Sequence, residues 1–379
     1  MHSAQPTETK KNPSLPTRHS EICESDFAAA QAFLLGAKNF WTTTFYQELR
    51  HQYESRVDKK NAEARTPDEA VAEVEEDVSY HFFAWLERHL QRMKYTSRYG
   101  LVPYHSERRD TLTQEAGFSL QDEYAPVLDP DFELPKYYKS MDVHQHQGGL
   151  WSDITAGFAY EYGARTTTPL LGETHEDLHK RFTEFVADGV DFRHILDLGC
   201  GFGKSTRPFV QRFPKSAIEA VDLSGPCLYV ASQFAREKRT KNVHYSQQDA
   251  RHTNFDGGSF DLVTSTMLLH EMPVKSVLQL FAECYRLLQP GGQMAHLDFY
   301  ILPDAFDRFM HYGHSRRNNE IYMRGVAEFD LPAELQEIGF TDVRIERFKE
   351  SADQDLDAHD AWRFPWTAIC AVKPQQAAA

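Results

Sequence analysis

From about His194 to Pro374 the chain alternates short apolar runs with stretches of helical periodicity, and this alternation constrains the fold most. The apolar runs are HILDLG, AIEAVDLS, VHYSQQD, FDLVTSTMLL, QMAHLDFY, DVRIERF and WTAICAVKP. Repetition of strand and helix places the strands in a mostly parallel sheet with helices on both faces. We therefore expect an α/β fold built on a doubly wound, mostly parallel seven-stranded sheet.

The part before this alternation has a different character. Residues 1–20 are polar and contain three prolines, which is typical of a disordered tail. Two helical stretches follow, and a charged segment at 58–69 between them predicts a turn that packs them antiparallel. The first apolar stripe consists of Phe27, Ala30, Leu34, Ala37, Trp41, Phe45, Leu49 and Tyr53, and the second of Val71, Val74, Val78, Phe82, Leu86, Leu90 and Met93.

Four prolines break the region from about Arg98 to Trp151, which we interpret as a connecting or lid-like segment. The predicted organisation is then a disordered tail over 1–20, a helical N-terminal lobe and lid over 21–150, and a ligand-binding α/β domain over 151–379.

Composition narrows the classes of function. Hydrophobic residues make up 41% of the chain and charged residues 26%, which suits a packed globular protein. We find no apolar run long enough to cross a membrane and no secretory signal in 1–20, and the five cysteines form no CxxC pair. The net charge of −15 disfavours a nucleic-acid substrate. We expect a cytoplasmic protein with reduced thiols, no membrane partner and a small-molecule substrate.

The most informative motif is the glycine-rich turn after the first apolar run. Glycines at 199, 201 and 203 leave room for the backbone to approach a ligand at the carboxyl edge of the sheet. A dinucleotide fingerprint requires GxGxxG, whereas here the spacing is GxGxG and Lys204 follows. This departure disfavours a dehydrogenase, which stays open as a third hypothesis.

The segment DLGCGFG resembles motif I of the class I S-adenosylmethionine (SAM)-dependent methyltransferases, most closely their small-molecule branch of quinone and sterol methyltransferases. Further similarities follow in order, in VDLS, QDA, FDLV and LLQPGG. The resemblance covers roughly half of the chain and implies a Rossmann-like methyltransferase domain with SAM as cofactor. It implies that the cofactor is bound by Asp197, Gly199, Gly201, Gly203, Asp222, Leu223, Asp249, Ala250, Met267 and Tyr162.

Within that resemblance, Asp222 is expected to accept hydrogen bonds from the ribose hydroxyls, because a carboxylate can accept from two vicinal hydroxyls at once. Asp249 is expected to accept from the adenine amine, while the backbone amide of Ala250 reaches the ring. Tyr162, and Tyr160 with it, precede the α/β region where family members often place aromatic side chains against the cofactor. Plain core packing of these tyrosines is the alternative.

Candidates for catalysis come from two places. His270 and Glu271 follow the fourth predicted strand, where an imidazole can remove a proton from an acceptor near neutral pH; alternatively they shape the cofactor pocket and cap the next helix. His144 and His146 share one face if their segment is extended, which is compatible with metal ligation. A third ligand is not evident nearby, so we predict no metal site, and hydrogen bonds in the lid are the alternative.

We therefore predict a methyltransferase that modifies a small-molecule metabolite, with an oxygen or nitrogen acceptor favoured. Two alternatives stay open. One is a methyltransferase acting on protein or peptide side chains, with the N-terminal lobe as docking surface, and the other is a catalytically silent SAM-binding subunit. A homodimer is also left open.

Overall fold

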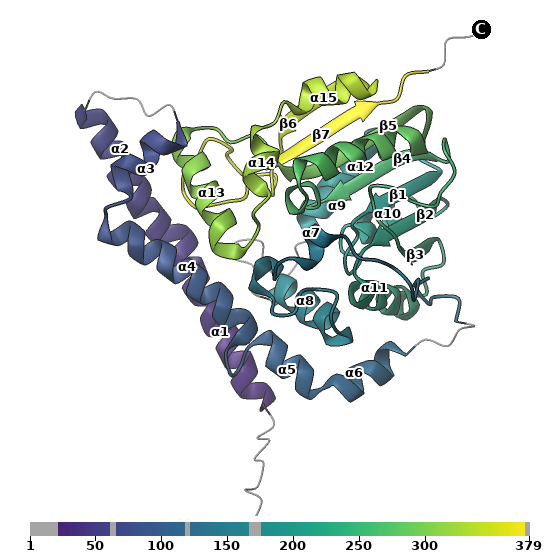
Figure 1. The fold of residues 1–379 in the computed structure, drawn as a ribbon, viewed down its shortest axis with the longest axis horizontal. Coiled ribbons are helices and arrows are strands. Elements are labelled where there is room, and N and C mark those ends of the chain that lie inside the picture. Colours follow the sequence, from purple (N-terminus) through teal and green to yellow (C-terminus); the bar gives the residue numbers. More distant parts are fainter. Residues whose placement is uncertain (1–21, 61–65, 118–121, 167–175, 376–379) are drawn as a thin grey trace, which may run out of the picture.

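A computed structural model describes residues 22–60, 66–117, 122–166 and 176–375. The predicted tail over 1–20 lies outside these residues. Figure 1 shows two parts, a layered sheet with its covering helices and a group of long helices beside it. No helix in the described ranges combines the length and the apolar composition that a membrane span needs.

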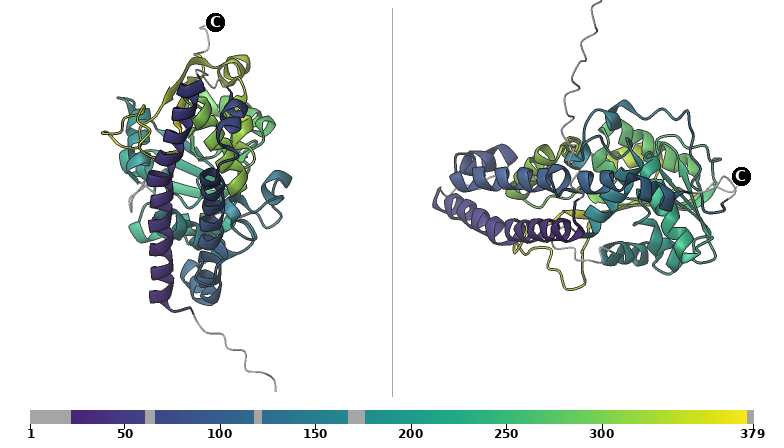
Figure 2. Two further views of the ribbon diagram at one scale, coloured as in Figure 1. Left: turned by 90° about the vertical axis from the view of Figure 1, so that its left-hand side faces the viewer. Right: turned by 90° about the horizontal axis from the view of Figure 1, so that it is seen from below.

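The long helices form the predicted N-terminal lobe. Helix α1 (Glu24–Phe40) continues through a π-helical turn, η1 (Trp41–Phe45), into α2 (Tyr46–Lys60), and α3 (Pro67–Val74) then leads into α4 (Val78–Thr96). Helices α1 and α4 lie side by side in both views of Figure 2. Trp41 fixes this pairing, since its indole Nε1 donates to the carbonyl oxygen of Phe83 at 3.1 Å and the two rings stack 4.7 Å apart.

The buried face of α4 differs from the predicted apolar stripe. Phe82 is 50% exposed and Met93 is 40% exposed, although both were expected to face inward. Leu90 is buried as predicted, whereas Phe83, Glu87 and Lys94 are buried one residue beyond the predicted positions, with Glu87 4% and Lys94 6% exposed. The stripe prediction was therefore wrong for most of this helix, because it excluded charged side chains that pair with other residues or line a cavity.

The region after α4 contains more helix than expected. It holds α5 (Leu101–Glu107), α6 (Arg109–Ala116), the short α7 (Lys136–Lys139) and a 3₁₀ turn, η2 (Val143–Gln145). His144 and Gln145 in this turn have φ values of 54° and 58°, in the left-handed region that side chains other than glycine rarely adopt. Such strain persists only where surrounding contacts hold it, and it is common at functional sites.

The predicted seven-stranded sheet is confirmed. Its strand order is β3-β2-β1-β4-β5-β7-β6, with β7 antiparallel to both of its neighbours and the other pairs parallel. The strands are β1 (His194–Leu198), β2 (Ala217–Asp222), β3 (Val243–Gln247), β4 (Phe260–Thr266), β5 (Leu288–Phe299), β6 (Thr341–Arg347) and β7 (Trp366–Val372). The carboxyl ends of β1, β2 and β4 meet at one edge, where the glycine-rich turn lies.

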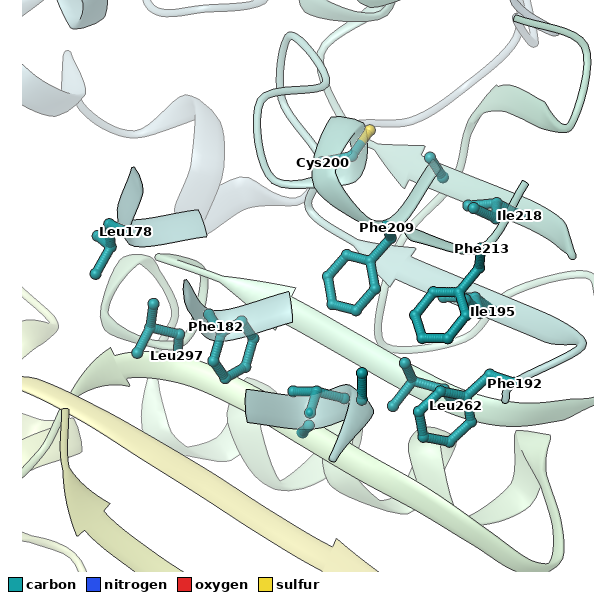
Figure 3. Close-up of a cluster of buried hydrophobic side chains, with 14 of the residues drawn as sticks. Leu178, Phe182, Phe192, Ile195, Cys200, Phe209, Phe213, Ile218, Leu262 and Leu297 are labelled. Atoms are coloured by element: carbon teal, nitrogen blue, oxygen red, sulfur yellow. The ribbon is translucent and has the colours of Figure 1, made fainter. Parts of the chain in front are cut away.

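Helices cover both faces of this sheet. They are α9 (Glu176–Ala187), α10 (Thr206–Arg212), α11 (Gly225–Lys238), α12 (Val274–Leu287), α14 (Met323–Glu328) and α15 (Leu331–Ile338), with a 3₁₀ turn η3 (Leu269–Glu271) after β4. Helix α8 (Ile154–Thr166) packs against α5 and α11, and α13 (Ala305–Asn318) packs against α3 and α4. Figure 3 shows the core on one face, where Phe182 of α9 and Phe209 of α10 pack over Ile195 and Leu262. A second apolar cluster, from α12 and α15, fills the other face.

Helix α13 connects the sheet to the N-terminal lobe. Phe306 and Phe309 belong to the apolar cluster of that lobe, where the ring of Phe306 lies 4.8 Å from that of Tyr53. Arg50 of α2 pairs with Asp304, just before α13, at 2.6 Å. The lobe core is therefore completed by residues far along the chain, and any division at residue 150 cuts across it.

Candidate functional site

The glycine-rich turn after β1 has the backbone conformation that its sequence predicts. Gly199, Gly201 and Gly203 have φ values of 67°, 53° and 80°, all in the left-handed region. A Cβ at Gly199 would lie 2.7 Å from the side chain of Leu268, so a larger residue would also clash there. Asp197 is buried below the turn and accepts hydrogen bonds from the hydroxyls of Ser205 at 2.8 Å and Thr206 at 2.7 Å. It holds the turn against α10 rather than lining a cavity.

A cavity of about 110 Å³ opens beside this turn. It is lined by seven of the predicted cofactor-binding residues, namely Gly199, Gly201, Asp222, Leu223, Asp249, Ala250 and Met267. We call it the cofactor cavity. Gly203 lies away from it, since a Cβ there would meet the hydroxyl of Tyr245 at 2.9 Å.

Asp222 stands at the end of β2 and is already oriented by the backbone. Its carboxylate accepts from the amide of Gly201 at 2.9 Å and from that of Ser224 at 2.7 Å. Burial raises the pKa of Asp222, while these amide donors act in the opposite direction. Each oxygen of Asp222 accepts one backbone amide, so each keeps a lone pair that can accept a hydrogen bond from a ligand hydroxyl in the cavity.

Asp249 is also held in place before any ligand arrives. Its two oxygens accept from the guanidinium of Arg251, with the shortest distance 2.5 Å, and one of them accepts the Arg251 amide at 2.9 Å. Tyr137 lies over the same guanidinium, 5.3 Å from its ring centre. The Asp249 carboxylate therefore reaches the cavity with a fixed direction.

A second cavity, of about 230 Å³, lies between the N-terminal lobe and the sheet. Its wall includes Lys38 from α1, Trp41 from η1, and Glu87, Gln91 and Lys94 from α4. We call it the lobe cavity. Six residues line both cavities, namely His144, Tyr160, Gly199, Gly201, Met267 and Glu271. The two spaces therefore meet at the glycine-rich turn and at η2.

His270 lies in η3, at the floor of the lobe cavity. Its Nδ1 is 2.6 Å from Oδ1 of Asp298, and its ring stacks on Phe299 with the ring centres 4.5 Å apart. Asp298 also accepts the amide of Leu269 at 2.7 Å, so it orients the whole turn. Burial disfavours the charged imidazole, yet the carboxylates of Asp298 and Glu271 outweigh it and raise the pKa of His270 well above its usual value.

His144 links two carboxylates at the junction of the cavities. Its Nδ1 is 2.8 Å from Oε1 of Glu320, and its Nε2 is 3.3 Å from Oε1 of Glu271. The same Glu271 oxygen lies 3.5 Å from Nε2 of His270. Burial lowers the pKa of His144, but the two carboxylates outweigh burial and raise it. Glu271 thus lies between two imidazoles that both favour the positive charge.

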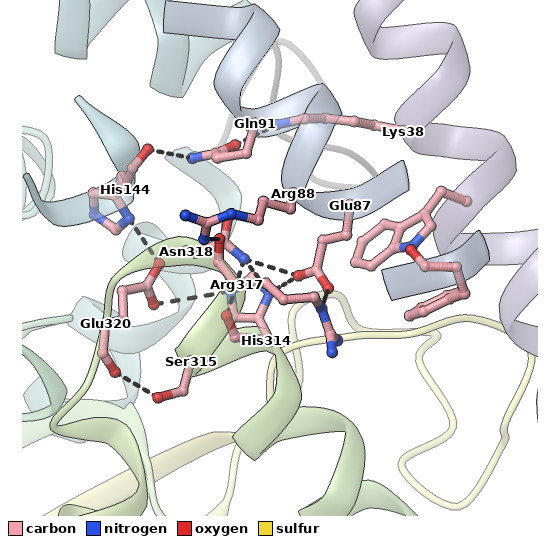
Figure 4. A network of polar contacts seen from close by, with 12 residues as sticks. Lys38, Glu87, Arg88, Gln91, His144, His314, Ser315, Arg317, Asn318 and Glu320 are labelled. Carbon is pink, nitrogen blue, oxygen red and sulfur yellow. Dashed lines mark hydrogen bonds and ion pairs between the residues drawn. The ribbon is translucent and has the colours of Figure 1, made fainter. Parts of the chain in front are cut away.

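The contacts continue from Glu320 into the lobe, as Figure 4 shows. Oε2 of Glu320 is 3.8 Å from Nε2 of His314, whose Nδ1 is 2.5 Å from Oε1 of Glu87. Glu87 also accepts from Arg317 and, at 2.8 Å, from Asn318. Burial raises the pKa of Glu87, yet the charges of Arg317 and His314 outweigh it and lower that pKa.

Comparison with known proteins decides the class of the sheet domain. Residues 195–292 match the family model described as a methyltransferase domain. This segment is a class I methyltransferase domain. The match confirms the superfamily predicted from the glycine-rich turn, whose cofactor is SAM.

Individual relatives are about a third identical to this chain over the segment that aligns with it. Phosphoethanolamine N-methyltransferase 2 of Caenorhabditis elegans is 30% identical over 138 residues, which is 36% of this chain and 30% of the relative. Demethylmenaquinone methyltransferase of Lactococcus lactis is 32% identical over 121 residues, 30% of this chain and 47% of the relative. This chain therefore spans less than half the length of either protein.

A solved structure, the Haemonchus contortus phosphoethanolamine N-methyltransferase 2 with S-adenosyl-L-methionine, is 22% identical, with a TM-score of 0.44. It covers 64% of this chain, and this chain covers 61% of it.

Besides Asp197 and Gly203, two further residues predicted for the site of the methyltransferase domain lie outside both cavities. His146 follows the bend of η2, so it does not share a face with His144; its ring packs 4.9 Å from that of Tyr95 and burial lowers its pKa to about 4. Tyr162 faces Phe27, with ring centres 5.1 Å apart. Tyr160, two residues earlier on α8, lines both cavities instead.

One group of side chains has the composition of a metal site. His144, Glu271 and Glu320 can bring one ligand atom each within 4.8 Å of one another, which supplies the third ligand that the sequence did not reveal. The imidazole, however, faces Glu320 with Nδ1 and Glu271 with Nε2. The imidazole therefore bridges the two carboxylates in the observed arrangement.

Sequence reasoning missed the residues that the N-terminal lobe contributes, chiefly Lys38, Glu87 and Lys94. A signal for them exists in the chain. Phe83, Glu87, Leu90 and Lys94 follow one another at spacings of four, three and four, so two charged residues occupy the same helix face as two apolar ones. Charges inside an otherwise apolar stripe indicate a polar site within a core.

Proposed function

We propose that this protein transfers a methyl group from SAM to a small-molecule acceptor bound in the lobe cavity. One observation carries the proposal: the cofactor cavity and the lobe cavity share the glycine-rich turn, His144 and Glu271. Methyl transfer is an in-line displacement, which requires the acceptor atom to face the methyl carbon from the side opposite the sulfur. Two adjoining cavities with a common wall provide that arrangement.

The cofactor cavity suits the parts of SAM that need polar recognition. Asp222 would accept from the ribose hydroxyls, and Asp249, with the amide of Ala250, would hold the adenine ring. The bound sulfonium supplies an electrophilic methyl group. The glycine-rich turn lets the cofactor approach the backbone at the point where the cavities meet.

Glu271 is the residue we assign to the acceptor. Of the described residues, it is the only carboxylate that lines both cavities. A carboxylate there accepts a hydrogen bond from an N–H or O–H of the acceptor, orients its lone pair and takes the proton as the new bond to carbon forms. This favours the predicted oxygen or nitrogen acceptor.

His144 and His270 act on Glu271 as positioning residues. Each imidazole places a nitrogen within 3.5 Å of the same Glu271 oxygen, and each is fixed by a second carboxylate behind it, Glu320 and Asp298. His270 therefore supports the base instead of contacting the acceptor directly.

Two titrations and one assay test this proposal. Calorimetry of the purified chain with SAM and with S-adenosylhomocysteine should show saturable binding of both. A screen of small amines, phenols and acids with methyl-labelled SAM should then find an acceptor. No binding of either nucleoside would overturn the proposal, whereas binding without transfer to any acceptor would favour the silent-subunit alternative, and transfer only to intact proteins would favour the protein-substrate one.

The homodimer left open by the sequence remains a prediction. Light scattering on the same purified sample measures the mass directly, and a mass near that of one chain would contradict it.

A further inference from the structure

The inner faces of α1 and α4 carry polar residues where a helix pair ordinarily packs apolar side chains. On α4 these are Glu87, Gln91 and Lys94, and on α1 the corresponding residue is Lys38, one turn before the buried Trp41. All four side chains line the lobe cavity. The seam between the two helices is therefore a polar wall of the proposed acceptor site.

The acidic member of this wall is already neutralised. The Glu87 carboxylate contacts Arg317, His314 and Asn318, which provide its charged and hydrogen-bonding partners without a lysine. Within the described ranges, Lys38 and Lys94 form no ion pair with any carboxylate. The ammonium of Lys38 donates to Oε1 of Gln91 at 2.8 Å.

Lys94 is the more unusual of the two. It is 6% exposed, it makes no hydrogen bond to the part of the chain that the structure describes, and its nearest aromatic contact is the ring of Tyr95 at 5.2 Å. Burying an ammonium without a partner costs several kcal/mol, so such a group either loses its proton or receives an anion. Burial, together with the neighbouring charge of Lys38, lowers the pKa of Lys94 well below its usual value.

The pKa of Lys38 is also lowered. Burial lowers its pKa to about 8, against a smaller opposing effect of Glu87. At neutral pH Lys38 still carries its charge, and an anion between the two lysines would stabilise the charged form of both. A negative group would thus supply the counter-ion that neither lysine has among the described residues.

A short series of hydrogen bonds connects Lys38 to the residues around Glu271, where we propose that the methyl group is transferred. Gln91 connects the two ends, because its Oε1 accepts from Lys38 and its Nε2 donates to the backbone oxygen of His144 at 3.0 Å. Figure 4 shows Gln91 between these residues. One side-chain amide therefore connects Lys38 to η2, whose His144 contacts Glu271.

We propose that Lys38 and Lys94 bind an anionic group, a carboxylate or a phosphate, of the methyl acceptor. The acceptor is then a small acid with its anionic end at the α1–α4 seam and its nucleophilic atom at Glu271. This inference rests on the proposed function, since it names the substrate class of the same site.

The test uses simple anions as probes on the full-length chain saturated with S-adenosylhomocysteine, at pH 7. Sodium phosphate and sodium acetate are titrated separately by calorimetry, with acetamide as the uncharged control. We expect at least one anion to bind and acetamide not to bind. The anion that binds more tightly distinguishes a phosphate from a carboxylate acceptor.

Lysine variants assign the site. Lys38→Met and Lys94→Met should each weaken anion binding about tenfold or more, because each removes a charged donor. Lys215→Met, on an exposed lysine outside both cavities, is the matched control and should bind as the wild type does. The affinity for S-adenosylhomocysteine should stay the same in all three variants. Should Lys94→Met not fold, Lys38→Met alone decides.

The inference is overturned if neither anion binds to the loaded protein, or if the lysine variants bind anions as tightly as the control does. A protein that binds no S-adenosylhomocysteine would instead contradict the proposed function. In that case the same anion titrations on the unloaded chain still measure whether the two lysines form an anion site.

Discussion

The two cavities are built in opposite ways. The wall of the cofactor cavity that carries Asp222 and Asp249 is made by the glycine-rich turn and the residues that end β2 and β3. Its two carboxylates are oriented by backbone amides or by a neighbour two residues away. The lobe cavity is made by side chains from α1, α4, η2, η3 and the end of α13, and its contacts join residues more than 170 positions apart. The first depends on local backbone geometry and the second on tertiary packing.

This difference has a consequence for mutation. Changes in the cofactor cavity should alter binding while leaving the fold intact, whereas changes in the lobe cavity should affect stability, catalysis or both. The following predictions test this difference between the two cavities.

The largest effect is expected for Glu271→Gln, at the boundary of the two cavities. The amide keeps the size of the side chain but cannot take a proton, so kcat should fall by about 10²- to 10⁴-fold. The affinity for S-adenosylhomocysteine should be retained. His146→Gln is the comparison variant, because His146 lies outside both cavities. Unchanged turnover in Glu271→Gln would remove Glu271 from the mechanism.

Glu87→Gln should destabilise the lobe. It leaves the charge of Arg317 buried without its carboxylate, and breaking a buried pair in this way costs about 3–5 kcal/mol of the free energy of unfolding. Glu76→Gln, on an exposed side chain of the same lobe, should change that free energy little. Urea denaturation of both variants measures the difference, and equal midpoints would contradict the assigned pairing.

The pH dependence of stability gives a second readout of the same pair. The folded pKa of Glu87 is lowered, so its contribution is complete above its unfolded pKa of about 4.3 and is lost as the pH falls toward the folded value. The pKa values of His144 and His270 are raised, so their contributions are complete below about 6.5 and are lost as the pH rises through the folded values. Glu87→Gln should flatten the acid limb of the stability curve and leave the alkaline limb.

Asp222→Ala should weaken cofactor binding without comparable damage to the fold. Lost hydrogen bonds to a charged group correspond to about 1–3 kcal/mol of binding free energy for S-adenosylhomocysteine. Calorimetry measures this loss, and a thermal melt of the same sample checks folding. An unchanged affinity would show that the cofactor does not lie against β2.

The smallest effect is expected from removing metal ions. Because His144 faces its two carboxylates with different nitrogens, we expect EDTA, or added Mg²⁺ or Mn²⁺, to leave turnover unchanged. Activity that EDTA abolishes and one cation restores would place that cation on His144, Glu271 and Glu320, and would replace the bridging arrangement described above.

The same contrast explains what could be predicted from the sequence. The sheet and the cofactor cavity follow from local patterns, since an apolar strand that ends in spaced glycines allows few backbone geometries. His144 and Glu271 were named individually, but their contact was not, because it depends on how η2 packs against η3. Tyr162 was chosen over Tyr160 since both fit an aromatic position before the sheet, and only the rotation of α8 distinguishes them. Lys94 was missed because periodicity assigns a charge to the solvent side.

The π-helical turn at Trp41–Phe45 sets the rotation of α1 relative to α2 about their common helix axis. A π turn holds one more residue than the α-helical turn it replaces, so it offsets the faces of α1 and α2 by about 100°. Deleting a single residue there would restore an unbroken α-helix at little cost to backbone hydrogen bonding, yet it would rotate everything before it. Lys38 would turn out of the cavity wall while the helix remained whole, so a relative that lacks this extra residue would be expected to accept a different class of substrate.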